Sequence, residues 1–177
     1  VLACLERLQR GVNVADLGSE SVPCNPLRML NHWDNLVESP TLGSIERVWG
    51  GKTIFDWTDL SRPNSRYVDY ARLLASLGIN GVSLNNVNAT EEILSPRMIR
   101  GLASLAEVLR GWGIRIWVSI DYASPVTLGG LSTADPLDPA VREWWCNKVD
   151  EIYGQIPEFG GFVVKADSEG RPGPGEY

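Results

Sequence analysis

Apolar residues along this chain follow two alternating patterns, which together predict strands followed by helices. Short continuous apolar runs are typical of buried strands, whereas apolar residues spaced three or four positions apart are typical of helices packed on one side. The predicted strands cover residues 27–31, 79–84, 114–120 and 162–165. The predicted helices cover residues 66–77, 95–109 and 139–153.

Glycine and proline residues support the predicted helix boundaries. Gly78 follows the first predicted helix, and Gly111 and Gly113 follow the second, at positions where helices commonly end. Pro96 stands in the first turn of the second helix, where its missing N–H costs nothing. Strands that alternate with helices in this way indicate parallel βαβ units.

Each predicted strand runs into polar or ionisable side chains. These strand-end residues are Asn31, His32, Asn85, Asn86, Asp121, Tyr122, Lys165, Asp167 and Glu169. In a (β/α)8 barrel the carboxyl ends of the strands converge on one mouth, where catalytic residues collect. A doubly wound sheet would instead place a glycine-rich turn after its first strand, where this chain has Asn31-His-Trp-Asp34.

The fold class that we predict is therefore α/β, a partial (β/α)8 TIM barrel with about four βα units, because a whole barrel needs about 250 residues. The chain has 177 residues. Residues 50–53 (GGKT) match part of a P-loop, but Glu46 stands where that motif needs a glycine and no apolar strand precedes it. We interpret the P-loop match as chance.

Charge and cysteine content narrow the classes of partner. Sixteen Lys and Arg against 22 Asp and Glu give a net charge of -6 with both signs scattered, so we expect no nucleic acid and no membrane as a partner. The chain begins at Val1 rather than Met, so we expect a missing upstream segment and a protein that is either cytoplasmic or secreted. Cys4, Cys24 and Cys146 are too widely spaced for a disulfide framework or a zinc site, and we expect buried free thiols.

Six longer motifs stand in order along the chain. They are residues 31–35 (NHWDN), 43–47 (GSIER), 70–81 (YARLLASLGING), 84–89 (LNNVNA), 133–139 (TADPLDP) and 161–170 (GFVVKADSEG). Together they strongly resemble the α-glucuronidases of glycoside hydrolase family 67. The resemblance covers residues 28–177 and implies the N-terminal half of a catalytic barrel, truncated at its end. Residues 1–27 are similar to the linker and helix that lead into that barrel.

The resemblance implies an inverting hydrolase that removes (4-O-methyl)glucuronic acid from xylooligosaccharides in xylan breakdown, without a metal or organic cofactor. It implies that Glu169 is the general acid and that Lys165 faces the carboxylate of the uronic acid. Glu46 and Arg47 match positions that contact the sugar ring. The base carboxylates of the family lie beyond residue 177, so we expect this chain alone to be inactive. The implied partner is a glucuronic-acid-substituted xylooligosaccharide, and the full-length protein is compatible with a homodimer.

Further candidates for substrate binding lie at the ends of the first three strands. Trp33 is the best candidate for a sugar contact, because an aromatic face packs well against the C–H face of a pyranose ring. His32 is either a pocket residue or a structural hydrogen-bonding partner. Asn85, Asn86 and Asp121 are expected at the rim of the mouth, with a simple turn as the alternative for the two asparagines.

Two other functions stay open on the sequence alone. One is a different barrel glycoside hydrolase that acts on another α-linked sugar, and the other is a non-catalytic carbohydrate-binding half-barrel. The chain also departs from the family pattern on both sides of the 43–47 motif. The link between Asn35 and Gly43 is longer than is usual in the family, and residues 48–51 (VWGG) replace the usual Gly-Tyr-Ala-Gly.

Overall fold

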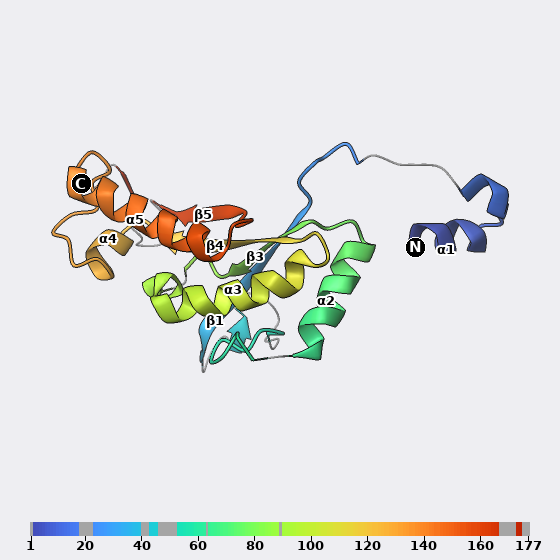
Figure 1. Ribbon diagram of the computed structural model, residues 1–177, viewed down its shortest axis with the longest axis horizontal. Helices are drawn as coiled ribbons and strands as arrows, with labels where there is room; N and C mark the ends of the chain where they lie inside the picture. Colours follow the sequence, from blue (N-terminus) through green and yellow to red (C-terminus); the bar gives the residue numbers. More distant parts are fainter. Residues whose placement is uncertain are drawn as a thin grey trace.

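The chain folds around a five-stranded sheet with helices packed against it (Figure 1). The computed structural model describes residues 2–17, 23–39, 43–45, 53–62, 64–88, 90–166 and 173–174. The strands are β1 (Met29–Ser39), β2 (Gly43–Ile45), β3 (Gly81–Asn85), β4 (Arg115–Asp121) and β5 (Gly161–Lys165).

The order of the strands is that of a barrel wall. In the sheet order β2-β1-β3-β4-β5, the four strands β1, β3, β4 and β5 are parallel and follow one another in sequence. A doubly wound sheet would reverse its strand order at a switch point, and this sheet does not. The predicted α/β fold with parallel βα units is confirmed, and the arrangement is that of a partial (β/α)8 barrel.

Three helices connect the parallel strands, and all three were predicted to within two residues at each end. They are α2 (Ser65–Ser76), α3 (Pro96–Arg110) and α5 (Pro139–Gln155). Each begins after a polar cap whose side chain accepts a hydrogen bond from a main-chain N–H of the first turn. These caps are Asn64, Ser95 and Asp138. The shorter helices are α1 (Leu2–Gln9), η1 (Val14–Leu17), η2 (Glu91–Leu94) and α4 (Ser124–Thr127).

Strand β1 is longer than the predicted strand 27–31, and it forms a hairpin that the sequence pattern does not predict. Its end pairs antiparallel with β2, with Ser39 opposite Gly43 and Asp34 opposite Ile45. The link that exceeds the usual family length therefore begins as a continuation of β1. The sequence does not predict this part of the strand, because residues 31–35 (NHWDN) have the polar composition of a loop.

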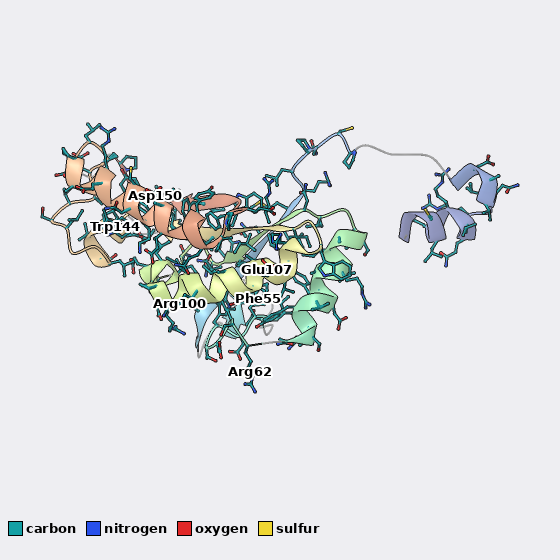
Figure 2. The ribbon with its side chains drawn as sticks, in the orientation of Figure 1. Phe55, Arg62, Arg100, Glu107, Trp144 and Asp150 are labelled. Atoms are coloured by element: carbon teal, nitrogen blue, oxygen red, sulfur yellow. The ribbon has the colours of Figure 1, made fainter. Side chains whose placement is uncertain are left out.

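The hydrophobic core lies between the sheet and the helices. Side chains that alternate along β3 and β4 contribute Val82, Leu84, Ile116, Val118 and Ile120. Helix α3 contributes Met98, Ile99, Leu102, Leu105 and Leu109. The segment 53–60 adds Phe55, Trp57 and Leu60, and Phe55 is labelled in Figure 2. Each such side chain stabilises the fold by about 1.5–3 kcal/mol through burial.

Trp117 fills the other face of the sheet near the amino ends of the strands, and it needs glycine around it. A Cβ atom added at Gly81 would lie 2.6 Å from the Trp117 ring, and one added at Gly160 would also overlap that ring. We predict that Gly160→Ala lowers the free energy of unfolding by about 1–3 kcal/mol, because overpacking forces side chains off their preferred rotamers.

Thermal unfolding of the full-length protein tests this expectation. Gly154→Ala is the matched control, because nothing lies within 4 Å of a Cβ atom added at Gly154 in α5. That control should be neutral or stabilising by up to about 1 kcal/mol. Equal effects of the two substitutions would contradict the packing described for Trp117.

The cysteines differ from the expectation. The expectation of buried thiols is wrong, because Cys4, Cys24 and Cys146 are all exposed and unpaired. Cys146 lies on the solvent side of α5, and Cys4 is on α1, which lies away from the sheet (Figure 1). Among the described residues, no helix is both long and apolar enough to cross a bilayer.

Candidate active site at the carboxyl edge of the sheet

Three of the predicted site residues share the face of the sheet that points away from the helices. Leu84 and Ile120 pack in the helix-side core, so the residues next to them in β3 and β4 point to the opposite face. Asn85 ends β3, Asp121 ends β4, and Lys165 ends β5 directly opposite Asp121 in the strand register. The structure therefore brings Asn85, Asp121 and Lys165 to one edge, where a barrel has its mouth.

Asn85 is fully buried and holds β3 to β4. Its Nδ2 donates to the Ser119 carbonyl at 2.9 Å, and its Oδ1 accepts from the Ser119 N–H at 2.7 Å. The Ser119 hydroxyl donates to the Asn85 carbonyl at 2.9 Å. The side-chain amide thus replaces main-chain ladder bonds where the two strands separate, which fixes the shape of the sheet at this edge.

Asn86 connects β1 to the loop after β3. Its Nδ2 donates to Asn35 Oδ1 at 3.0 Å, and its Oδ1 accepts from the Asn88 N–H at 2.8 Å. Its own main-chain N–H donates to the Asp34 carbonyl at 2.8 Å. Asn86 therefore forms a turn, which was one of the two alternatives for it, and it also connects that turn to β1.

Asp121 is buried and starts the turn that follows β4. Its Oδ1 accepts from the Ala123 N–H at 2.8 Å, and its carbonyl accepts from the Ser124 hydroxyl at 2.6 Å. The turn fixes the carboxylate next to Lys165, which is half-buried in the neighbouring strand. An anionic and a cationic side chain therefore stand side by side at the mouth.

His32 points to the helix layer. Its Nε2 is hydrogen-bonded to the Tyr70 hydroxyl of α2, and its ring meets the Phe55 ring edge to face at 5.5 Å. Burial lowers the pKa of His32 and raises the pKa of Tyr70, so the phenol keeps its proton and donates it to a neutral imidazole. These contacts favour the structural interpretation of His32 over the pocket interpretation.

Asp34 was not singled out from the sequence, yet it is the most perturbed carboxyl group in the described part of the chain. It is 1% exposed, and its Oδ2 accepts from the Thr53 hydroxyl and from Trp57 Nε1 at 3.2 Å. His32 Nδ1 lies 3.8 Å from its Oδ1. Burial raises the pKa of Asp34 to about 7, although the Trp57 bond opposes this shift.

We predict that Asp34→Asn becomes more stabilising, relative to the parent protein, as the pH rises. With a folded-state pKa of about 7 and an unfolded value near 4, the folded protein binds more protons between these values, so its stability falls as Asp34 ionises. The variant cannot ionise at this position. Its free energy of unfolding, relative to that of the parent, should therefore rise by about 2–3 kcal/mol between pH 5 and pH 8.

Thermal unfolding of the full-length protein at both pH values measures this gain. Asp56→Asn is the control, because hydrogen bonds from Thr58 lower the pKa of the exposed Asp56 and its replacement should bring no gain at higher pH. A pH-independent difference between Asp34→Asn and the parent would refute the assignment of the raised pKa.

The remaining predicted residues divide into one that is placed and three that are not. Trp33 lies in β1 between His32, which contacts Tyr70 of α2, and Asp34, which contacts Trp57 of the core, so strand alternation puts it on the opposite face with the mouth residues. Glu46, Arg47 and Glu169 lie outside the described residues.

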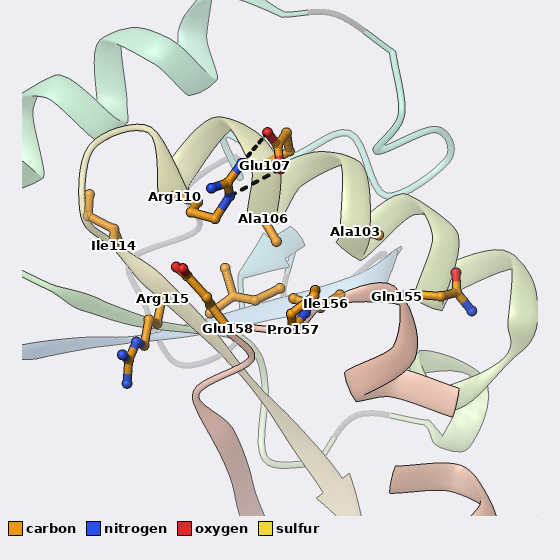
Figure 3. Close-up of a pocket in the computed structure, with 11 residues that line it drawn as sticks. Ala103, Ala106, Glu107, Arg110, Ile114, Arg115, Gln155, Ile156, Pro157 and Glu158 are labelled. Atoms are coloured by element: carbon orange, nitrogen blue, oxygen red, sulfur yellow. Dashed lines mark hydrogen bonds and ion pairs between the residues drawn. The ribbon is translucent and has the colours of Figure 1, made fainter. Parts of the chain in front are cut away.

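A small cavity elsewhere in the fold is not a candidate for the substrate site. Figure 3 shows it between α3 and the turn before β5, lined by Arg110, Arg115, Ile156 and Glu158 among others. Arg110 is paired with Glu107 at 2.5 Å beside it. The cavity measures about 40 Å³, which is enough for water but not for a sugar, and it lies at the amino ends of the strands.

Parallel βα units with polar and charged residues gathered at the carboxyl ends of the strands are the arrangement of (β/α)8-barrel enzymes. The sequence model of the glycosyl hydrolase family 67 middle domain matches residues 7–177, and the chain belongs to this family. The resemblance inferred from the sequence motifs is thereby confirmed.

Curated relatives agree with this assignment. Alpha-glucuronidase A of Emericella nidulans is 48% identical over 174 residues, which cover 98% of this chain and 20% of that protein. Probable alpha-glucuronidase A of Aspergillus fumigatus is 46% identical over 174 residues with the same coverage, and the alpha-glucuronidase of Hypocrea jecorina is 46% identical over 159 residues, 89% of this chain and 19% of that protein. The chain spans about a fifth of the length of these relatives.

Proposed function

We propose that this chain is the N-terminal half of the catalytic barrel of an inverting α-glucuronidase. Residues 28–177 supply the first βα units of that barrel, and residues 1–27 lead into it. The enzyme hydrolyses the α-1,2 bond between (4-O-methyl)glucuronic acid and a xylooligosaccharide. The observation that carries the proposal is the family match over residues 7–177 together with relatives named as alpha-glucuronidases.

The proposed reaction is a single displacement at the anomeric carbon. Glu169 donates its proton to the glycosidic oxygen as the bond to the xylose breaks, so that the xylose leaves with a hydroxyl group. A water molecule attacks from the opposite face and gives up a proton to a base carboxylate. We expect that base on a segment that follows residue 177. No metal or organic cofactor takes part in these steps.

The substrate contacts follow from the charges at the mouth. Lys165 pairs with the carboxylate of the uronic acid, which both orients the sugar and compensates its charge. Trp33 offers an aromatic face to the sugar ring, and Glu46 and Arg47 contact its hydroxyl groups. Asn85, Asn86 and Asp121 support the rim, because their hydrogen bonds hold β1, β3 and β4 in place.

Incubation with aldotriouronic acid, in which 4-O-methylglucuronic acid is linked to xylobiose, tests this proposal. The full-length protein should release the uronic acid and xylobiose, and the chain of residues 1–177 should release neither. Turnover by residues 1–177 alone would show that the base lies within them, and no release by the full-length protein would refute the proposed activity.

A further inference from the structure

Asp34 joins three segments of the chain at the end of β1. Its main chain pairs with Ile45 of β2, and its carboxylate accepts hydrogen bonds from Thr53 and Trp57 of the segment 53–60. Its carbonyl accepts from the Asn86 N–H after β3. One buried residue therefore ties β1 to β2, to the segment 53–60 and to the loop after β3.

The carboxylate also lies where the sheet changes register. Asn31 is opposite Ser83 and Asp34 is opposite Asn85, so three steps along β1 correspond to two steps along β3. An extra residue of this kind bends a strand and redirects the side chains around it. The extra residue leaves Asp34 on the helix side, against Trp57, although its partner Asn85 points away from the helices. Trp33, between His32 and Asp34, therefore takes the face opposite to both.

Burying the carboxyl group of Asp34 costs more free energy than a purely structural residue at this position would. The side chain is 1% exposed, and its Oδ1 has no hydrogen-bond partner among the described residues. An unsatisfied buried oxygen is destabilising, and an apolar side chain of similar size would avoid that cost. Strained or costly groups of this kind are characteristic of functional sites.

We infer that Asp34 is a positioning residue, which holds the shifted end of β1 against Thr53 and Trp57 so that Trp33 is presented to the sugar at the mouth. The inference rests on the proposed function for the role of Trp33, but the hold on β1 stands on the structure alone. Asp34 itself lies on the helix side of the sheet and does not reach the reacting atoms.

A double-mutant cycle in the full-length protein tests the inference with aldotriouronic acid as substrate. Asp34→Ala and Trp33→Ala should each raise KM about tenfold while changing kcat less than about threefold. The double variant should be no worse than Trp33→Ala alone, because Asp34 acts through Trp33. Asp34→Asn should restore KM, since its amide oxygen still accepts from Thr53 and Trp57. A double variant that multiplies the two effects would overturn the inference.

Hydrogen exchange separates this inference from the proposed function. In Asp34→Ala, amides of residues 29–39 should exchange faster while those of α3 stay unchanged, whether or not the protein hydrolyses the substrate. Thr53→Val removes one donor and keeps Asp34, so it provides a milder variant with the same direction of change. Asp69→Ala, on the exposed face of α2, is the control and should alter neither reading. Unchanged exchange in residues 29–39 of both test variants would overturn the positioning role, and lost hydrolysis in the parent would overturn only the proposed function.

Discussion

Replacing Glu169 by Gln is expected to lower kcat for aldotriouronic acid by roughly a hundredfold to ten-thousandfold, with little change in KM. Glutamine keeps the size and polarity of the side chain but has no proton to give to the leaving xylose oxygen. A glucuronyl fluoride needs no such proton, because fluoride departs as an anion. The same variant should therefore hydrolyse the fluoride at nearly the parent rate.

The comparison of two leaving groups distinguishes loss of the proton donor from general damage. Glu143→Gln, on the exposed side of α5, is the matched control and should leave both rates unchanged. If Glu169→Gln slowed the fluoride as much as the aldouronic acid, Glu169 would not be the general acid. Unchanged kcat on the natural linkage would exclude that role as well.

The second large effect is expected at Lys165, as a loss of selectivity for uronic acids. Lys165→Ala removes the cation proposed to pair with the sugar carboxylate, and charge-assisted hydrogen bonds contribute about 1.5–3 kcal/mol. We predict that kcat/KM for the uronic acid substrate falls roughly a hundredfold. The neutral glucosyl analogue has no carboxylate to lose its partner, so its kcat/KM should change little.

The ratio of the two kcat/KM values is the informative quantity. Lys148 is the control, because its ammonium already donates to the Leu94 carbonyl at 3.1 Å and pairs with Glu151 of the same helix at 2.6 Å. Lys148→Ala should lower stability and leave the ratio unchanged. An unchanged ratio in Lys165→Ala would favour a barrel glycosidase for a different α-linked sugar, which was one of the alternatives left open by the sequence.

The parts of the fold that could be predicted from the sequence are those in which local signals agree. Helix α3 has Ser95 as its cap, Pro96 in its first turn and apolar residues on one face, and it was predicted to within one residue at each end. Strands β3, β4 and β5 were short apolar runs whose polar ends marked the mouth. Because sequential parallel strands lie next to one another in a barrel, Asn85, Asp121 and Lys165 could be expected at one edge.

The features that could not be predicted depend on tertiary contacts. Residues 31–35 have the composition of a loop, yet β1 continues through them because the segment 53–60 covers their helix-side face. Phe55, Trp57 and Leu60 have neither a helical nor a strand period, so no pattern marked that segment as part of the core. The burial of Asp34 depends on its tertiary neighbours, because the sequence alone predicts a solvent-exposed aspartate between a tryptophan and an asparagine.

The hydrogen-bond network fixes the carboxyl edge of this partial barrel. Asn85 joins β3 to β4, Asn86 joins β1 to the loop after β3, and Asp34 joins β1 to the core segment. These hydrogen bonds restrict the motion of the neighbouring side chains at the mouth, and such restriction is needed to orient a substrate. The proposed substrate contacts of Trp33 and Lys165 thus depend on neighbouring residues that do not themselves bind the substrate.

Proton NMR of the hydrolysis of aldotriouronic acid by the full-length protein tests the central claim most directly. An inverting α-glucuronidase must release 4-O-methylglucuronic acid first as its β-anomer, because water attacks the face opposite to the leaving xylose. We expect the β-anomeric signal to appear first and the α-anomeric signal to grow only with mutarotation. Initial release of the α-anomer, or no release of uronic acid, would contradict it.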